Sequence, residues 1–89
     1  MIWYVYMIEC SDGNIYTGVT TNIERRIDEH NSGVGCKYTR HRNPVKLLKS
    51  LEFINRSLAM KEEYRIKQLS RKEKIIFIKD LKNSLKKFR

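Results

Sequence analysis

The sequence has few of the residues that stabilise small proteins through disulfides, structural metal sites or rigid turns. It contains two cysteines, Cys10 and Cys36, and one proline in 89 residues. Two cysteines this far apart form neither a disulfide scaffold nor a zinc site, whose ligands are spaced by roughly two to four residues. No apolar run approaches the roughly 18 residues of a membrane span, and the residues after Met1 lack the features of a signal peptide. We therefore expect a reduced, cytoplasmic protein with no membrane partner.

Acidic residues are also scarce relative to basic ones. Nineteen lysines and arginines against ten aspartates and glutamates give a net charge of +9 and an isoelectric point near 9.8. Residues 61–89 hold eleven basic and four acidic residues, whereas residues 1–60 hold eight and six. This excess suits a polyanionic partner. Charge alone does not separate nucleic acid from an acidic membrane surface or from a solvated helix.

The pattern of apolar residues predicts one domain, residues 1–89, with the element order ββαβαα. Residues 2–10 and 15–20 are rich in β-branched and aromatic side chains and predict two strands joined by a turn at 11–14. The predicted fold class is α+β, a three-stranded and mainly antiparallel sheet packed by helices. The third strand is expected where apolar residues alternate after Pro44, at Val45, Leu47, Leu51 and Phe53.

Capping patterns predict where the helices begin and end. The segment Thr21-Asn22-Ile23-Glu24 has the form of a capping box and opens a first helix, which Ser32-Gly33 ends. A second helix is expected to start near Asn55 or Ser57 and to run to Leu69. Ser70-Arg71-Lys72-Glu73 is another capping box and opens a basic helix over about 71–88. This last helix has one apolar stripe, formed by Ile75, Ile78, Leu81, Leu85 and Phe88.

Two polar residues lie on or beside the apolar face of the first helix. At about 100° per residue, with Ile23 at zero, His30 lies at about −20° and Arg26 at about −60°, whereas Arg25 points away. One interpretation is a hydrogen-bonded core histidine and an arginine that extends to solvent along the apolar surface. The other is that both side chains belong to a functional site.

The second helix places a carboxylate on its inward side. With Leu58 at zero, Glu62 lies at about 40° and faces inward, while Glu63 lies at about 140°, points outward and can pair with Lys67. An inward carboxylate is costly unless it is paired or binds a metal. Glu62 is therefore either the partner of Arg65 or Arg26, or a metal ligand.

The relation of Tyr6 to Tyr16 depends on the hairpin loop between them. The two side chains share one face of the sheet only if the loop has an odd number of residues. A two-residue turn at Asp12-Gly13 would separate them, whereas a three-residue loop from Asp12 to Asn14 would align them. The sequence permits both.

Taken together, these segments resemble the GIY-YIG nuclease superfamily over about residues 2–75. Tyr4-Val5-Tyr6 and Tyr16-Thr17-Gly18 look like its two name-giving triplets. The run Asn22–Arg26 with His30 is similar to its arginine helix, and 59–69 is similar to its glutamate helix. Residues 35–40 and the end of the glutamate helix look most like the short stand-alone UPF0213 members.

The sequence departs from the superfamily pattern at several points. Tyr4 stands in place of the glycine of the first triplet, and Thr17 in place of the isoleucine of the second. We match no asparagine after the glutamate helix. The DNA-recognition domains that larger members carry have no counterpart here, which leaves substrate specificity open.

The resemblance implies a nuclease that hydrolyses phosphodiester bonds of nucleic acid, with DNA favoured over RNA, in repair or processing. Glu62 would bind one Mg²⁺ or Mn²⁺ ion. Arg26 would stabilise the charge that builds on the phosphoryl oxygens. Tyr6 would help deprotonate the attacking water, with His30 as an alternative base or proton relay. Tyr16 would orient water or phosphate.

Further residues would contact the nucleic acid, and two rival functions stay open. Gly18 would allow backbone or substrate to come close. The first rival is a non-catalytic nucleic-acid-binding module with the same fold, and the second is an adaptor whose basic terminal helix binds an acidic protein. Basic residues expected to contact phosphates without reading bases are Lys37, Arg40, His41, Arg42 and Arg56.

Overall fold

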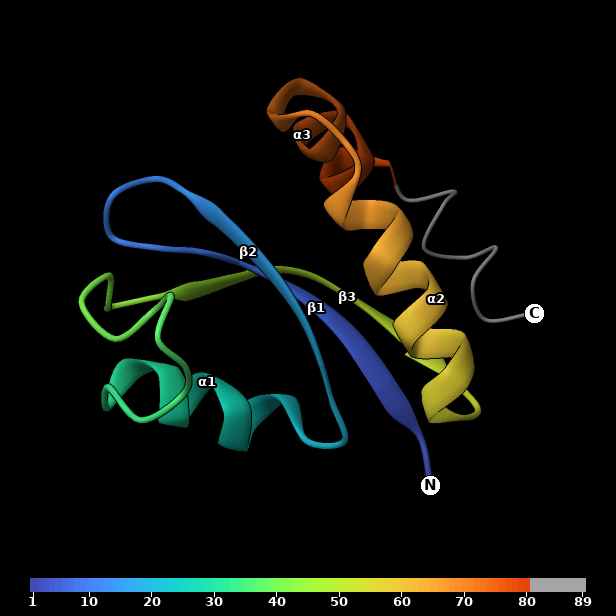
Figure 1. The fold of residues 1–89 in the computed structure, drawn as a ribbon, viewed down its shortest axis with the longest axis horizontal. Coiled ribbons are helices and arrows are strands. Elements are labelled where there is room, and N and C mark those ends of the chain that lie inside the picture. Colours follow the sequence, from blue (N-terminus) through green and yellow to red (C-terminus); the bar gives the residue numbers. More distant parts are fainter. Residues whose placement is uncertain (81–89) are drawn as a thin grey trace.

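Three strands form one antiparallel sheet with helices on both faces (Figure 1). In the computed structural model, which describes residues 1–80, β1 (Trp3–Glu9) lies between β2 (Ile15–Thr20) and β3 (Lys46–Phe53). Both outer strands pair with β1 in the antiparallel sense. The predicted α+β class and the order ββαβαα are confirmed.

The helices form two layers. The helix α1 (Ile23–Asn31) covers one face of the sheet, and α2 (Arg56–Lys67) and α3 (Arg71–Lys79) cover the other (Figure 1). The helix α3 ends at Lys79 because Asp80 has extended backbone, and the rest of the predicted basic helix lies outside the described residues. Within residues 1–80, no helix has the length and apolar character to cross a bilayer.

The side chains of β1 alternate between two cores. Val5 and Met7 pack with residues of β3, α2 and α3, while Tyr6 and Ile8 pack beneath α1. Because successive side chains of a strand point to opposite faces, the nearly continuous apolar run of β1 serves both layers at once. The central strand is therefore buried on both sides.

The hairpin between β1 and β2 has a three-residue loop, residues 11–13. The Cys10 amide donates to the Asn14 carbonyl at 2.8 Å, and Gly13 takes the left-handed backbone (φ 86°) that closes such loops. The odd loop length pairs Tyr6 with Gly18 and Ile8 with Tyr16. Tyr6 and Tyr16 therefore share a face, as the three-residue alternative predicted, although the loop starts one residue earlier than expected.

A β-bulge divides β3 between the two cores. Met7 pairs with Lys49 and Ile8 with Leu47, so one extra residue is inserted between these pairs. The insertion reverses the alternation along the strand. Val45 packs in the core beneath α1 and Leu51 in the core beneath α2 and α3, although the even spacing from Val45 to Phe53 suggested one common face.

The helix starts follow the capping chemistry of short polar residues. The N-cap of α1 is Asn22, whose side chain accepts from the Arg25 amide, so the capping box expected at Thr21 does not form. Asn55 caps α2, which confirms the first of the two predicted starts, and the helix ends at Lys67, two residues before the predicted end. The capping box at Ser70 is present as predicted.

Candidate functional site

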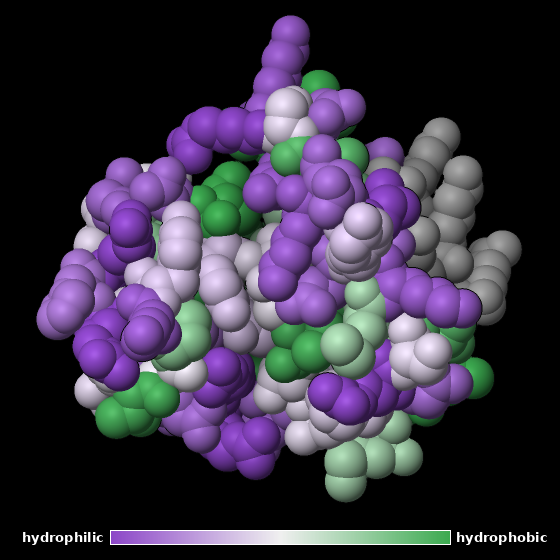
Figure 2. Space-filling model, viewed as in Figure 1, coloured by the Kyte–Doolittle hydropathy of each residue, from purple (hydrophilic) through white to green (hydrophobic). Residues whose placement is uncertain are grey.

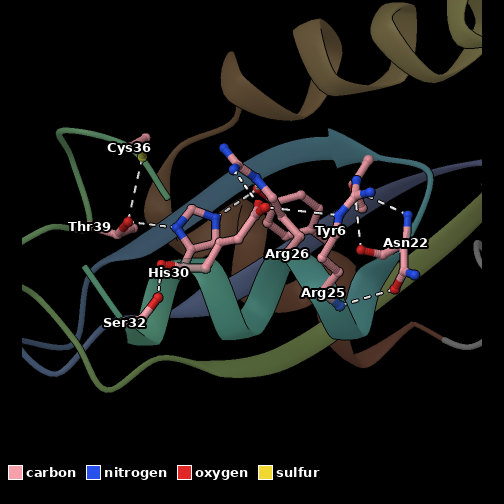
Figure 3. A network of polar contacts seen from close by, with 10 residues as sticks. Tyr6, Asn22, Arg25, Arg26, His30, Ser32, Cys36 and Thr39 are labelled. Atoms are coloured by element: carbon pink, nitrogen blue, oxygen red, sulfur yellow. Dashed lines mark hydrogen bonds and ion pairs between the residues drawn. The ribbon is translucent and has the colours of Figure 1, made fainter. Parts of the chain in front are cut away.

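A series of polar side chains runs through the core beneath α1 (Figure 3). The Tyr6 hydroxyl lies 2.9 Å from Nε2 of His30, and Nδ1 of His30 lies 2.6 Å from Oγ1 of Thr39. Sγ of Cys36 is 3.5 Å from the same hydroxyl, at the far end of the series. At the near end, Nε of Arg26 donates to the Tyr6 hydroxyl at 3.4 Å.

One histidine tautomer satisfies all donors and acceptors of this series. The Tyr6 oxygen already accepts from Arg26, so its own hydrogen needs an acceptor, and His30 Nε2 provides it. A neutral imidazole then carries its hydrogen on Nδ1 and donates it to Thr39. The Thr39 hydroxyl is left to donate to Cys36. Every member of the series is satisfied in this arrangement, as a buried polar network requires.

Burial keeps the two central groups neutral. Tyr6 is 1% exposed and His30 0%. Burial raises the pKa of Tyr6, and the neighbouring Arg26 offsets only part of that rise. Burial, with the charge of Arg26, lowers the pKa of His30. A neutral phenol thus rests against a neutral imidazole.

Arg26 connects this buried series to solvent. Its side chain is 25% exposed and forms an ion pair with Glu29 at 2.9 Å, one helical turn away. The hydrogen bond to Glu29, opposed by burial and assisted by Tyr6, raises the pKa of Arg26, so the guanidinium stays charged. Arg25 is mostly exposed. The expected contrast between the two arginines, and the inward position of His30, are confirmed.

Two glycines fit the ring network closely. A Cβ atom built on Gly18 would lie 2.5 Å from the Tyr6 hydroxyl oxygen, and one built on Gly35 would lie 2.5 Å from Nδ1 of His30. The group that approaches Gly18 closely is the Tyr6 side chain, whereas the sequence predicted backbone or substrate there. Gly35, by contrast, was not assigned a role from the sequence.

Thr39 and Cys36 were also missed as members of the site. Both lie in the loop after α1, and only their place in the UPF0213-like segment 35–40 marked them beforehand. The pKa of the Cys36 thiol is lowered. Burial alone would raise this pKa, but hydrogen bonds from Thr39 and Tyr16 together outweigh burial. Tyr16 extends the cluster, since its ring meets the His30 ring edge-on at 5.5 Å between centroids.

The α2 carboxylate singled out from the sequence is buried but paired. Oε1 and Oε2 of Glu62 accept from Nε and Nη2 of Arg65 at 2.9 and 2.7 Å. The Arg65 guanidinium lies over the ring of Phe77 from α3, 5.3 Å from its centroid. The predicted inward position of Glu62 and its pairing with Arg65 are confirmed, and this pair faces α3.

Glu63 lies on the other flank of the inward side of α2. With Leu58 at zero and about 100° per residue, the buried residues Ala59 and Ile66 fall at about 100° and 80°. The inward direction of α2 is therefore near 90°, about 50° from each of the two glutamates. Leu58, which the sequence predicted to be the inward reference position, is exposed. The predicted pair of Glu63 with Lys67 forms, at 3.1 Å. However, the Glu63 side chain is only 17% exposed, so its predicted outward position is wrong.

The charge of Glu63 acts on the tyrosine of the network. Burial is the main cause of the raised pKa of Tyr6, and the negative charge of Glu63 adds to it. Glu62 and Glu63 are therefore adjacent in the sequence but lie in different environments. Glu62 pairs with Arg65, which lies over Phe77 of α3. The charge of Glu63 affects the pKa of Tyr6 in the α1 layer.

The structure divides the predicted phosphate-contacting residues between two places. Lys37, Arg40 and His41 are exposed in the loop that carries Thr39. Arg42 closes that loop against the hairpin, through an ion pair with Asp12 at 2.6 Å. The fifth residue, Arg56, stacks over Trp3 at the opposite end of β1. It is not brought together with the other four.

Comparison with known proteins identifies the family. The model of the GIY-YIG catalytic domain matches residues 2–75. The chain belongs to the GIY-YIG family. A UPF0213 protein of Halobacterium salinarum is 59% identical over 71 residues, which are 80% of this chain and 92% of that protein. One of Streptococcus agalactiae is 51% identical over 80 residues, 90% and 91% of the two chains. The chain is thus also a UPF0213 member.

Two solved structures share the fold. A UPF0213 protein of Bacillus halodurans is 48% identical, with a TM-score of 0.55 over 89% of this chain and 86% of that one. A protein of E. faecalis is 44% identical, with a TM-score of 0.62 over 89% and 84%. The names of these UPF0213 relatives state a family and no activity, so the catalytic-domain match is what connects this chain to nuclease chemistry.

Proposed function

We propose that this UPF0213 protein is a metal-dependent nuclease that hydrolyses phosphodiester bonds in nucleic acid, DNA in preference to RNA. The observation that carries the proposal is the series Arg26–Tyr6–His30, in which a charged guanidinium at the surface joins a buried phenol and a neutral imidazole. A cation, a proton carrier and a proton acceptor in sequence are the groups that phosphodiester hydrolysis uses. The match to the GIY-YIG catalytic domain supports the same reaction class.

Each group has a distinct part in the proposed reaction. The Arg26 guanidinium pairs with the phosphoryl oxygens and stabilises their growing charge. Its contact with the Tyr6 hydroxyl is long, at 3.4 Å, so turning toward a phosphate costs little and opens the hydroxyl to water. The water then gives a proton to the Tyr6 oxygen as the Tyr6 proton passes to Nε2 of His30. The resulting hydroxide attacks phosphorus, and the bond from phosphorus to the leaving oxygen breaks.

A divalent cation fits this site in one coordination mode. Within residues 1–80 no group of three or more histidine, cysteine or acidic side chains is placed to enclose a metal. Mg²⁺ is commonly held by one or two carboxylates, with water and substrate phosphate completing the shell. A single α2 carboxylate is enough for that mode. When bound, the ion supplies Lewis-acid stabilisation of the phosphate and of the leaving oxygen.

Two glutamates compete for the role of metal ligand. Glu62 is the ligand predicted from the resemblance. Two observations support Glu63: its charge raises the pKa of Tyr6, and both oxygens of Glu62 accept from Arg65. We therefore propose Glu63 as the main carboxylate ligand, with Glu62 as the alternative that the same experiment tests.

A cleavage assay tests the function and the ligand together. The protein would be incubated with labelled single-stranded, duplex, flapped and four-way DNA, and with RNA, in Mg²⁺, Mn²⁺ or EDTA. Wild type should cut at least one substrate in a divalent cation and none in EDTA. Glu63→Gln should lose most of that activity, while Glu62→Gln should act mainly on stability, because it removes the charge that pairs with Arg65.

The outcomes separate the competing functions. If Glu62→Gln, folded by circular dichroism, loses activity while Glu63→Gln keeps it, then Glu62 is the ligand. If wild type cuts nothing but binds nucleic acid with a strong salt dependence, the non-catalytic binding module is the better hypothesis. If it neither cuts nor binds nucleic acid, the adaptor hypothesis gains instead.

A further inference from the structure

A small cleft lies between the tip of the β1–β2 hairpin and α3, and its lining residues have no part in the proposed reaction. It has a volume of about 230 Å³. Its walls come from three separate parts of the chain: the hairpin, the loop after α1 and the first turns of α3. The lining residues are Asn14, Ile15, Tyr38, Arg71 and Lys74.

The charge of this cleft is positive. Arg71 and Lys74 line it and no acidic side chain does. The carboxylate of Asp12, in the adjacent hairpin loop, is held by Arg42 at 2.6 Å. Lys74 has no ion-pair partner among residues 1–80. An anion in the cleft would therefore meet two cations whose charge is not neutralised by a carboxylate of the lining.

One of these cations is fixed in position. Nη1 of Arg71 donates to the carbonyl of Gly13 at 3.0 Å, a contact between residues 58 positions apart. The bond holds the guanidinium against the hairpin, which reduces the freedom that it would lose on binding a ligand. The amide side chain of Asn14, on the same rim, adds neutral hydrogen-bonding capacity.

The cleft adjoins the candidate site through a pair of stacked rings. The Tyr38 ring, which forms one wall, stacks on Tyr16 with 5.3 Å between centroids and 29° between planes. Tyr16 in turn contacts His30 at 5.5 Å. Hydrophilic side chains cover much of the face of the molecule that Figure 2 shows, with apolar side chains between them. The rings of Tyr38 and Tyr16 therefore connect the wall of the cleft to the candidate site.

We propose that this cleft is a second phosphate-binding subsite, in which Arg71 and Lys74 hold a phosphate that flanks the scissile one. The proposal rests on the proposed function, since nucleic acid is the anion that presents phosphates in series. The subsite positions the strand and reads no base, because its charged groups face a phosphate. The β1–β2 hairpin and α3 thereby act as one nucleic-acid contact.

Binding measurements in EDTA test the subsite without requiring cleavage. Fluorescence anisotropy with the oligonucleotide that wild type binds best would compare Arg71→Ala/Lys74→Ala with Lys61→Ala/Lys72→Ala. The control pair removes two exposed lysines that do not line the cleft. Loss of one phosphate contact should weaken binding about fivefold at physiological salt and lower the slope of log K against log salt by about 1. The control pair should change both less.

A second variant guards against damage to the hairpin. Lys74→Glu leaves the contact between Arg71 and Gly13 in place, and it should weaken binding at least as much as the double alanine variant. Neutral methylphosphonates placed one at a time along the strand then locate the phosphate. At one flanking position the substitution should weaken binding to wild type but not to Arg71→Ala/Lys74→Ala.

The results separate this proposal from the proposed function. Normal binding by Lys74→Glu, or effects equal to those of the control pair, would overturn the subsite even if the protein cuts DNA. A specific loss of binding with a matching methylphosphonate position would establish the subsite even if no substrate is cut.

Discussion

The two faces of the sheet use polar groups in different ways. Beneath α1, the buried polar side chains form one connected series from Arg26 through Tyr6 and His30 to Thr39. Beneath α2 and α3, the core is apolar, and the polar groups join structural elements. There the Lys49 ammonium donates to the carbonyls of Ile78 and Asp80 at the end of α3, and it lies over the ring of Phe77.

This contrast shows where the fold buries titratable groups. The α1 layer buries groups that gain or lose protons, which is costly unless each is hydrogen-bonded, and it contributes less apolar burial. The α2 and α3 layer supplies the packed apolar core that compensates. Changes in the first layer should therefore act mainly on activity, and changes in the second mainly on stability.

Replacing Arg26 should have the largest effect, and the effect should fall on activity. Arg26→Ala removes the guanidinium proposed to stabilise phosphoryl charge, and the rate of cleavage should fall by about 10²- to 10³-fold. The thermal midpoint should change little, because the side chain is partly exposed and its ion pair with Glu29 is near the surface. Arg25→Ala, on the exposed side of the same helix, is the control and should keep its activity. Equal losses in both variants would refute a specific role.

Truncating Ile66 should have the largest effect on stability. Ile66 is fully buried between α2 and the sheet, and Ile66→Ala should lower the free energy of unfolding by about 3 kcal/mol. Urea denaturation measures this value, with Ile76→Ala at an exposed position of α3 as the control. The fraction that stays folded should cut at the wild-type rate. A large drop in its intrinsic rate would show that the two layers are not separate.

Residues set by local chemistry were those that the sequence predicted well. The Ser70 capping box, the N-cap of Asn55 and the strand Ile15–Thr20 depend on neighbours in the chain and appear as expected. The inward position of His30 also follows from helix periodicity, because Ile23 and Ile27 mark the covered face.

Features that depend on distant parts of the chain could not be predicted in this way. The bulge in β3 reverses its alternation, and no signal in 46–53 announces it. Leu58 looked like the centre of the inward face of α2, but the sheet contacts Ala59 and Ile66 instead, which changes the positions of both glutamates. Thr39 is a further example, because only the folded loop brings its hydroxyl to His30.

The pH dependence of stability should report the state of His30. Burial and the charge of Arg26 lower the pKa of His30, while Glu29 opposes them, so the folded protein disfavours the imidazolium. The unfolded chain therefore binds more protons just below the ordinary histidine pKa of about 6.5. Stability should be full above that pH and should fall as the pH drops toward the lowered pKa.

A variant without the titrating ring isolates this effect. The thermal midpoint of the wild-type protein should fall as the pH is lowered from 8 to 5. The thermal midpoint of His30→Gln should fall by less over the same range. The lowered pKa values of Asp12, Glu29 and Glu73 affect stability only in more acidic solution, near and below the ordinary carboxyl range. The same slope in wild type and variant would mean that His30 is not held neutral.

The smallest predicted effect is a gain, at a polar atom that the apolar layer does not satisfy. Thr17 pairs with Met7 and so faces the core beneath α2 and α3, where its buried Oγ1 has no hydrogen-bond partner among the described residues. Thr17→Val keeps the shape and removes this hydroxyl, which should raise the free energy of unfolding by about 1 kcal/mol.

Thr20 is the matched control for this gain. It is also buried in β2, but its hydroxyl accepts from the Asn22 amide at 3.1 Å and donates to the Asn22 carbonyl at 3.2 Å. Thr20→Val should therefore destabilise the protein, because it leaves those groups at the start of α1 without their partner. Urea denaturation of both variants should give changes of opposite sign. A loss in both would mean that the Thr17 hydroxyl makes a favourable contact, and that the α2 and α3 layer is less apolar than its packing indicates.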